Sequence, residues 1–228
     1  MSVSRVKALP ENIELIIFDC DGVLVDSEAM IRMAHHKMLA AHGVEVSASA
    51  LMRDFAGLRG EEIAREVEKM FQVRLPPSYP ETVRQWLFEA YPSQLRAMNG
   101  AHQVLSRIRQ TCCVASNAPM RLLDRALTSV GMAASFQDRL FSADDVASGK
   151  PSPEIFHYSA DQMGVHVSRC LVVEDSVAGV KGALAAGMAA VGFVGGRHCS
   201  RETAGQLLDV GAVTVFDELA FLSSLLGA

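Results

Sequence analysis

The sequence lacks any hydrophobic stretch long enough to cross a bilayer, and it has no excess of basic residues. A membrane-spanning helix needs about 20 mainly apolar residues, and nucleic acid attracts clustered Lys and Arg, so we expect neither kind of partner. Its 21 basic residues are outnumbered by 26 acidic ones, which gives a formal net charge of −5. An anionic ligand therefore needs local positive groups, because the overall charge repels it.

Cysteine is also scarce, and no pair of the five cysteines has the C-x-x-C spacing of a zinc ribbon or a dithiol motif. Such usage is typical of reduced cysteines in the cytosol. The N-terminal residues do not show a signal-peptide pattern, because acidic residues directly follow their short apolar run. We expect a cytoplasmic protein that is a monomer or a weak homo-oligomer.

Half of the 228 residues are hydrophobic, which is enough for a sizeable core. Short apolar segments alternate with helical patterns along most of the chain. Strands are expected at 15–18, 111–115, 139–142, 170–173, 189–194 and 212–216, and helices at 101–110, 120–130, 153–163, 177–186 and 218–225. Strands that alternate with helices predict an α/β fold with a doubly wound parallel sheet, a Rossmann-like core.

One region departs from this alternation, because residues 30–97 show helical patterns and no convincing strand. Helices are expected at 27–42, 50–55, 60–71 and 80–91, the first with Ser27 as its N-cap. We therefore expect a helical domain, residues 30–97, inserted into an α/β core made of residues 1–29 and 98–228.

The first expected strand ends in two aspartates, Asp19 and Asp21, followed by Gly22. Ligands bind parallel sheets beyond the carboxyl ends of the strands, and two carboxylates there are costly to bury without a cation. This pattern indicates a Mg²⁺-assisted phosphoryl-transfer site with a carboxylate nucleophile. Asp and Gly are also common turn residues, so a plain turn stays open on these residues alone.

Polar residues follow three later strands or the loops after them. Ser116 and Asn117 end the second strand, where a hydroxyl and a backbone N–H can donate to a phosphoryl oxygen or cap the next helix. Lys150 stands in a proline-rich loop, either as a phosphate ligand or as a surface lysine. Glu174 and Asp175 close another apolar strand. A hard cation that prefers oxygen ligands accounts for both acidic strand ends together.

These residues are more specific as a set than singly. Asp19, Asp21, Ser116, Lys150 and Asp175 all fall at or just after strand ends of one expected sheet. Because the carboxyl ends of parallel strands share one edge, the set predicts a single site.

The chain resembles the haloacid dehalogenase-like hydrolase superfamily in four motifs. They are D-x-D-G-V at Asp19–Val23, the strand-end Ser116, Lys150 in G-K-P-x-P, and E-D at 174–175. The helical insertion resembles the small cap of the β-phosphoglucomutase-like branch. The segments V-D-S-E, L-F-S-x-x-D and E-D-S-x-A-G are similar to those of sugar-phosphate phosphatases, and of 6-phosphogluconate phosphatases in particular.

The resemblance implies a role for each motif residue in the hydrolysis of a small phosphorylated metabolite. Asp19 would attack phosphorus and form an aspartyl-phosphate, and Asp21 would protonate the leaving oxygen and then activate water. Mg²⁺ would be held by Asp19, the Asp21 backbone carbonyl and Asp175. Glu174 would lie at the metal or behind its ligands.

The same resemblance assigns the substrate phosphate to three groups: the Ser116 hydroxyl, the Asn117 backbone N–H and Lys150. The cap would close over the site. Arg59, in a cap loop, would contact the rest of the substrate; a solvent-exposed arginine is the alternative.

Other activities stay open to different degrees. The family's dehalogenases lack the second aspartate, so Asp21 argues against dehalogenation. The β-phosphoglucomutases carry a histidine where this chain has Met30 and Ile31, whereas His35 and His36 come about one turn later, where surface positions are expected. A non-catalytic sugar-phosphate-binding regulator is the alternative from another class. Met and Leu residues of the insertion are expected in its core, namely Met30, Met33, Met38 and Leu39.

Overall fold

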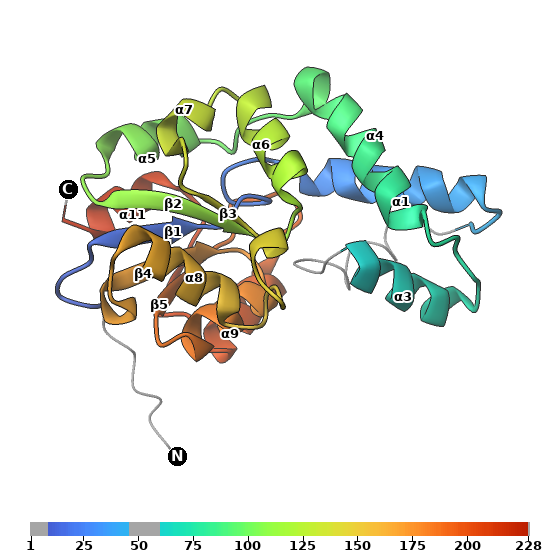
Figure 1. The fold of residues 1–228 in the computed structure, drawn as a ribbon. Helices are drawn as coiled ribbons and strands as arrows, with labels where there is room; N and C mark the ends of the chain where they lie inside the picture. Colours follow the sequence, from blue (N-terminus) through green and yellow to red (C-terminus); the bar gives the residue numbers. More distant parts are fainter. Residues whose placement is uncertain (1–8, 46–59, 228) are drawn as a thin grey trace, which may run out of the picture.

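A six-stranded parallel sheet forms the centre of the computed structural model, which describes residues 9–45 and 60–227 (Figure 1). The strands are ordered β3-β2-β1-β4-β5-β6. Their bounds are β1 Leu15–Phe18, β2 Thr111–Ser116, β3 Leu140–Ser142, β4 Cys170–Glu174, β5 Ala189–Phe193 and β6 Val215–Phe216. The order changes direction between β1 and β4, which is the switch point of a doubly wound fold. The expected fold class is confirmed.

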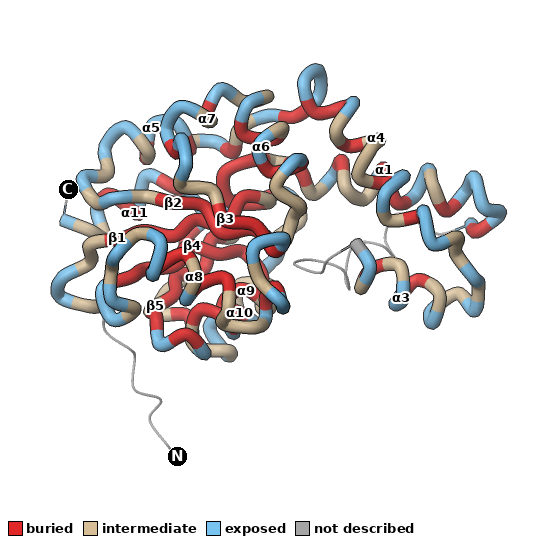
Figure 2. The backbone as a smooth tube through the Cα atoms, viewed as in Figure 1, coloured by how far each residue is buried: buried red, intermediate tan, exposed pale blue. Residues whose placement is uncertain are grey.

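Both faces of the sheet are covered, so its central strands are buried on two sides (Figure 2). In β1, Ile16 and Phe18 enter one hydrophobic cluster, whereas Leu15 and Ile17 enter the other. The first cluster takes residues from α5 (Ala101–Arg107), α6 (Met120–Ser129), α7 (Ala133–Phe136) and α11 (Ala220–Leu225). The second takes them from α8 (Glu154–Met163), α9 (Val177–Ala185) and α10 (Arg201–Asp209).

Among the described residues the cap contains the helices α1 (Glu28–Ala41), α3 (Gly60–Phe71) and α4 (Tyr79–Gln94), which lie beyond the carboxyl ends of the strands (Figure 1). The two chain segments that join them to the core pair with each other. Val25 and Ala97 form an antiparallel bridge, and the Met98 N–H donates to the Leu24 carbonyl at 2.8 Å. The cap is therefore an insertion, as expected. The boundaries at 29/30 and 97/98 stay a prediction, and the helix expected at 50–55 lies outside the described residues.

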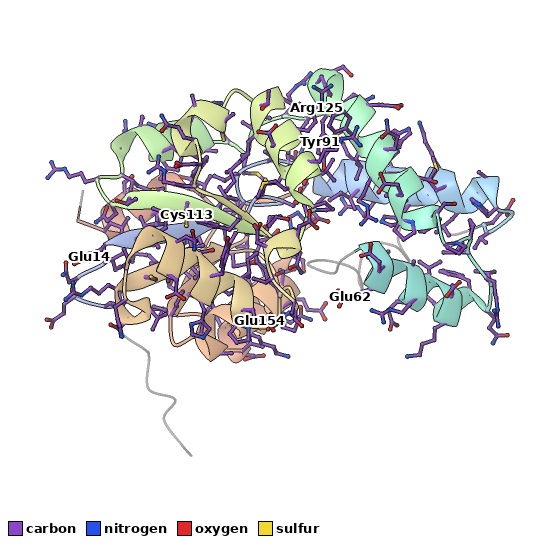
Figure 3. The ribbon with its side chains drawn as sticks, viewed as in Figure 1. Glu14, Glu62, Tyr91, Cys113, Arg125 and Glu154 are labelled. Carbon is purple, nitrogen blue, oxygen red and sulfur yellow. The ribbon has the colours of Figure 1, made fainter. Side chains whose placement is uncertain are left out.

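The cap is fastened to the core where a proline interrupts helix α4. Pro92 lies inside α4 and has no N–H, so the Phe88 carbonyl four residues earlier lacks its helical donor. The Arg125 Nε–H of α6 donates to that carbonyl at 3.2 Å. The guanidinium carbon of Arg125 also lies 4.6 Å from the centre of the Phe88 ring. Arg125 and Tyr91 lie where α6 meets α4 (Figure 3).

Several expected elements differ from the structure. Helix α10 was not expected, because Leu207 is its sole buried residue and apolar periodicity is weak there. The strand expected at 212–216 is reduced to Val215–Phe216, although the Val213 N–H already donates to the Ala190 carbonyl. Helix α4 extends beyond the expected 80–91 because Arg125 compensates for Pro92. Of the helices that the structure describes, none is both long and apolar enough to cross a membrane.

Two expectations for α1 are wrong. Met33, expected in the core, is 45% exposed, whereas Met30 and Leu39 are buried. His35, expected at the surface, is buried, and its Nδ1 lies 2.7 Å from the Tyr79 hydroxyl of α4. Burial lowers the pKa of His35 to about 4. A neutral His35 accepts the tyrosine hydrogen and so joins α1 to α4.

We expect His35 to make the folded state sensitive to acid. Between pH 6.5 and about 4 the unfolded chain binds a proton that the folded chain does not, so stability falls as pH falls through this window. The full shift corresponds to about 3 kcal/mol. Carboxyl groups whose pKa values are raised by burial act in the opposite direction in both proteins, so the test is the difference: in urea unfolding, wild-type stability relative to His35→Gln should fall as pH falls from 6.5 to about 4. The exposed neighbour gives the control: His36→Gln should keep the wild-type pH dependence, and a wild-type profile for His35→Gln would refute the assignment.

Candidate active site

The carboxyl ends of three adjacent strands bring the predicted residues together. Asp19 directly follows β1, and its backbone N–H donates to the Val173 carbonyl of β4 at 3.0 Å. Ser116 is the last residue of β2, and Glu174 is the last residue of β4. Strand pairing alone therefore fixes the relative positions of the backbone segments that carry the site.

Lys150 connects two of these strand ends through its side chain. Its Nζ donates to Asp19 Oδ1 at 2.5 Å and to Glu174 Oε1 at 2.6 Å. The Lys150 side chain is 2% exposed, so both ion pairs are shielded from water. The prediction of a lysine that enters the site is supported by this geometry, and a surface lysine is excluded.

Asn117 holds the loop that carries Lys150. Its side-chain Oδ1 accepts from the Lys150 N–H at 2.8 Å, and its Nδ2 donates to the Lys150 carbonyl at 3.1 Å. The Ser116 hydroxyl, which is buried, accepts from the Ala118 N–H at 3.0 Å. The sequence indicated a role for the Asn117 backbone; the structure adds this clamp by its amide side chain.

Glu174 is held from the opposite side by the start of helix α9. Its Oε2 accepts from both the Ser176 N–H, at 3.0 Å, and the Ser176 hydroxyl, at 2.9 Å. Ser176 also accepts from the Gly179 N–H and so caps α9. A Cβ on Gly179 would lie 1.8 Å from Glu174 Oε1, so this position admits only glycine while the carboxylate stays in place. Both carboxylate oxygens of Glu174 are therefore already hydrogen-bonded.

Asp21 is held by Ser27 and not by the lysine. The Ser27 hydroxyl donates to Asp21 Oδ1 at 2.5 Å. Ser27 stands at the N-cap position of α1, as expected, but its side chain makes no cap hydrogen bond there. The serine thus supports the carboxylate instead of the helix.

Asp175 has a partner that the sequence did not indicate. The Nε2 of His198, in the loop after β5, lies 2.8 Å from Asp175 Oδ2. Gly22 makes room for this pair: its φ is +83°, and a Cβ there would lie 1.8 Å from Asp175 Oδ2. Twenty-three residues separate the two partners, so sequence spacing gave no signal.

Burial and charge shift several pKa values in the site. Burial raises the pKa of Asp19 well above its ordinary value; Lys150 lowers it, and Glu174 and Asp175 raise it further. Burial lowers the pKa of Lys150, but Asp19 and Glu174 outweigh this effect and raise it, so the ammonium stays charged. Burial also raises the pKa of Asp21, against the Ser27 hydrogen bond.

The periphery of the site shows the same excess of negative charge. Burial and the nearby Asp175 raise the pKa of Glu28 to about 7. Burial lowers the pKa of His198, but its hydrogen bonds and Asp175 raise it to about 10. Burial is the main cause of the raised carboxyl pKa values, and neighbouring carboxylates add to it at Asp19 and Glu28.

A buried cluster of three carboxylates fits a metal ion. Oxygens of Asp19, Glu174 and Asp175 lie within 4.8 Å of one another. They are hard ligands, which suit Mg²⁺, Ca²⁺ or Mn²⁺ better than softer ions. Because the hydrogen bonds of Glu174 engage both its oxygens, Asp19 and Asp175 are the better direct ligands.

Arg59 is the one predicted site residue that lies outside the described residues. Sequence reasoning missed the roles of Ser27, Ser176 and His198. Ser27 was expected only to cap a helix, Ser176 stood in a motif in which no role was assigned to it, and His198 follows a glycine-rich loop without a motif of its own.

The contact between Gly179 and Glu174 gives a test of the site's packing. Glycine to alanine inside a helix normally stabilises by about 0.5–1 kcal/mol. Gly179→Ala should instead destabilise by about 1–3 kcal/mol, because the new methyl group displaces the buried Glu174 carboxylate. Urea unfolding measures both. Gly205→Ala in α10, where nothing lies within 4 Å of the added Cβ, should show the normal gain. A gain in both variants would contradict the tight packing.

Comparisons with known proteins identify the family. The haloacid dehalogenase-like hydrolase model matches residues 13–187. A 6-phosphogluconate phosphatase from Escherichia coli is 34% identical over 187 residues, which cover 82% of this chain and 85% of that protein. Hexitol phosphatase B from the same species is 29% identical and covers 80% of this chain and 84% of its own.

Solved structures agree with this assignment. A haloacid dehalogenase-like protein of unknown function from Agrobacterium tumefaciens has a TM-score of 0.83 and 36% identity, over 95% of this chain and 98% of that one. A family hydrolase from Deinococcus radiodurans with bound phosphate and sodium has a TM-score of 0.75 and 26% identity, over 93% and 97%. The chain belongs to the haloacid dehalogenase-like hydrolases, and its relatives group it with the members that hydrolyse phosphomonoesters.

Proposed function

We propose that this protein is a Mg²⁺-dependent phosphatase that acts on sugar or sugar-acid phosphates of the cytoplasm through an aspartyl-phosphate on Asp19. The observation that carries the proposal is the buried Lys150 ammonium between Asp19 and Glu174, with Asp175 beside them. Four acids, Asp19, Asp21, Glu174 and Asp175, meet at this place with two basic partners, Lys150 and His198, so a further cation is favoured there.

The residues present fit Mg²⁺. Asp19 and Asp175, with the backbone carbonyl of Asp21, would hold it, and Glu174 would stay behind these ligands because its oxygens are engaged. When bound, the ion supplies positive charge that offsets the repulsion between the Asp19 carboxylate and an anionic phosphate.

In the first half of the reaction a carboxylate oxygen of Asp19 attacks phosphorus in line with the leaving oxygen. The bond from phosphorus to that oxygen breaks, and Asp21 gives the oxygen a proton, so that an alcohol leaves. The raised pKa of Asp21 supports its role as the acid, since a raised pKa keeps more of the carboxyl protonated.

In the second half, Asp21 takes a proton from water. The resulting hydroxide attacks phosphorus, the bond to Asp19 breaks, and inorganic phosphate leaves with the Asp19 carboxylate restored. The Ser27 hydroxyl, which donates to Asp21 Oδ1 in the structure, holds this group in one orientation for both steps.

Three groups bind the transferring phosphoryl oxygens: the Ser116 hydroxyl, the Asn117 backbone N–H and the Lys150 ammonium. The loop that carries Lys150 is held before substrate enters, because the Asn117 side chain bonds both the N–H and the carbonyl of Lys150. Pre-oriented donors stabilise charge in the transition state without having to reorganise.

A pocket between cap and core supports a small substrate. Its volume is about 320 Å³, within the range of small-molecule sites. It extends from Pro119, three residues after Ser116, to helix α4. Its lining includes the basic residues Arg84 and Arg121 and the acidic residues Glu61, Glu81 and Asp144, and Arg84 is paired with Glu61 and Glu81. We assign the non-reacting part of the substrate to this pocket. That Arg59 contacts the substrate stays a prediction from the family resemblance. The names of the phosphatase relatives support a sugar or sugar acid.

A phosphosugar mutase is the second candidate, and the cap argues against it. The closest histidine to the mutase position, His35, is buried and tied to the Tyr79 hydroxyl inside the cap. It is therefore engaged in packing α1 on α4. A hydrolase remains the better assignment.

The decisive experiment is a phosphate-release assay on sugar phosphates, sugar-acid phosphates and unrelated phosphomonoesters, each with Mg²⁺ and with EDTA. We expect Mg²⁺-dependent release that is fastest with the sugar or sugar-acid phosphates. Interconversion of hexose 1- and 6-phosphates without net release would establish the mutase. Binding of the same compounds without either reaction would establish the non-catalytic regulator.

Asp19→Asn should lower phosphate release by roughly a thousandfold or more, because an amide is not a nucleophile for phosphorus. Lys150 keeps its pair with Glu174, so the variant should stay folded. Initial rates and a circular dichroism spectrum measure the two effects. Asp124→Asn, on the exposed surface of α6, should keep the wild-type rate. Wild-type activity in Asp19→Asn would show that the nucleophile lies elsewhere.

Asp21→Asn should lower phosphate release by roughly a hundred- to ten-thousandfold, since it removes the general acid and base. The loss should shrink for substrates such as p-nitrophenyl phosphate, whose leaving group needs no proton. Comparing kcat for that ester and for a sugar phosphate measures the difference. An equal loss for both esters would show that Asp21 does not protonate the leaving oxygen.

A further inference from the structure

The side chain of His198 is buried in the loop after β5. The stability of that loop does not explain why a histidine stands there. Its side chain is 7% exposed, and its Nε2 lies 2.8 Å from Asp175 Oδ2. Within the described residues its Nδ1 is buried and has no hydrogen-bond partner. An unsatisfied buried polar atom typically costs about 1–3 kcal/mol, so an apolar side chain would make a more stable loop.

The surrounding backbone is shaped to admit this ring. A Cβ on Gly196 would lie 2.3 Å from His198 Cε1 and 2.6 Å from its Nδ1. A Cβ on Gly22, in the first motif, would lie 3.0 Å from the same Cε1 and would strike Asp175. Gly22 and Gly196, which are far apart in the sequence, thus together leave the space that the contact between His198 and Asp175 needs.

The two acids at the end of β4 differ in how they are held. Glu174 has donors on both oxygens: Lys150 on Oε1, and Ser176 on Oε2. Asp175 is held through one oxygen, Oδ2, by His198. A carboxylate fixed through one oxygen keeps the other available for a metal ion.

We propose that His198 is a positioning residue for the metal site: its Nε2–H holds Asp175 by Oδ2 and so orients the carboxylate for Mg²⁺. The proposal rests on the proposed function, because it requires a cation at Asp175. It does not depend on the charge of the histidine, since Nε2 carries a hydrogen both in the protonated ring and in the neutral tautomer that donates. Cys199 Sγ, 3.2 Å from Nε2, is a weaker neighbour of the same hydrogen.

Two other roles make different predictions. If His198 only filled space, its loss would change stability but not Mg²⁺ affinity. If it acted as a positive charge that competes with the metal, its loss would tighten Mg²⁺ binding. Orientation by hydrogen bonding predicts weaker binding, and rescue by a side chain that can still donate.

The test is calorimetric titration of Mg²⁺ into the full-length wild type, His198→Ala and His198→Gln, with no substrate present. Removing a group that orients a metal ligand typically weakens metal binding by about 10- to 100-fold. We expect that loss in His198→Ala, and binding within about threefold of the wild type in His198→Gln, whose amide N–H can reach the same oxygen. His36→Ala, an exposed histidine on α1, is the matched control and should bind as the wild type does.

Unfolding in EDTA separates this role from packing, because stability is then measured without metal. Unchanged Mg²⁺ affinity in His198→Ala, tighter binding, or equal weakening in the alanine and glutamine variants would each overturn the proposal. If His198→Ala does not fold, the glutamine variant still decides, since binding more than tenfold weaker than in the wild type would refute donation by this position. Absence of Mg²⁺ binding to the wild type would instead refute the metal in the proposed function, and the role of His198 with it.

Discussion

The buried ammonium of Lys150 is the interaction on which the site depends. An ammonium that is 2% exposed is stable only because two carboxylates, Asp19 and Glu174, replace its hydration. Asp21 and Asp175 stand near the same point, so negative charge still exceeds positive charge there. The excess has a chemical consequence. A buried cluster of carboxylates with this excess suits a cation with a preference for oxygen ligands.

Much of the surrounding structure serves to hold that lysine and its partners. Asn117 fixes the Lys150 backbone, and Ser176 fixes the far oxygen of Glu174. Gly179 has no side chain, and a Cβ at this position would displace the Glu174 carboxylate. Each of these groups comes from a loop or helix start that follows a strand of the sheet, so β2, β4 and the loop before α8 are coupled through hydrogen bonds as well as through strand pairing. The position of the ammonium is therefore set by the backbone rather than by its own flexible chain.

The sequence predicted what strand periodicity and strand ends control. The runs before Asp19, Ser116 and Glu174 are apolar because both faces of a parallel sheet are buried, and their carboxyl ends meet at one edge for the same reason. The sequence did not predict the contacts that form when a loop packs against a distant part of the chain. The pair of His198 and Asp175 requires a turn after β5 whose shape no local pattern encodes, and Ser27 satisfied a capping pattern while its hydroxyl served Asp21. The helix predicted at 80–91 ended too early for a related reason: the group that compensates for Pro92 comes from α6, which lies far away in the sequence.

Pro92 and His198 show the same relation between local cost and long-range contact. Proline inside α4 leaves the Phe88 carbonyl without a helical donor, and Arg125 of the core supplies one. His198 leaves its own Nδ1 unsatisfied within the described structure while its Nε2 reaches Asp175. In each case a residue that is unfavourable for its own segment goes with a contact between segments: cap to core in one, loop to the carboxylate cluster in the other. Each residue therefore costs its own segment some stability, and the long-range contact that goes with it fixes where one segment lies against another.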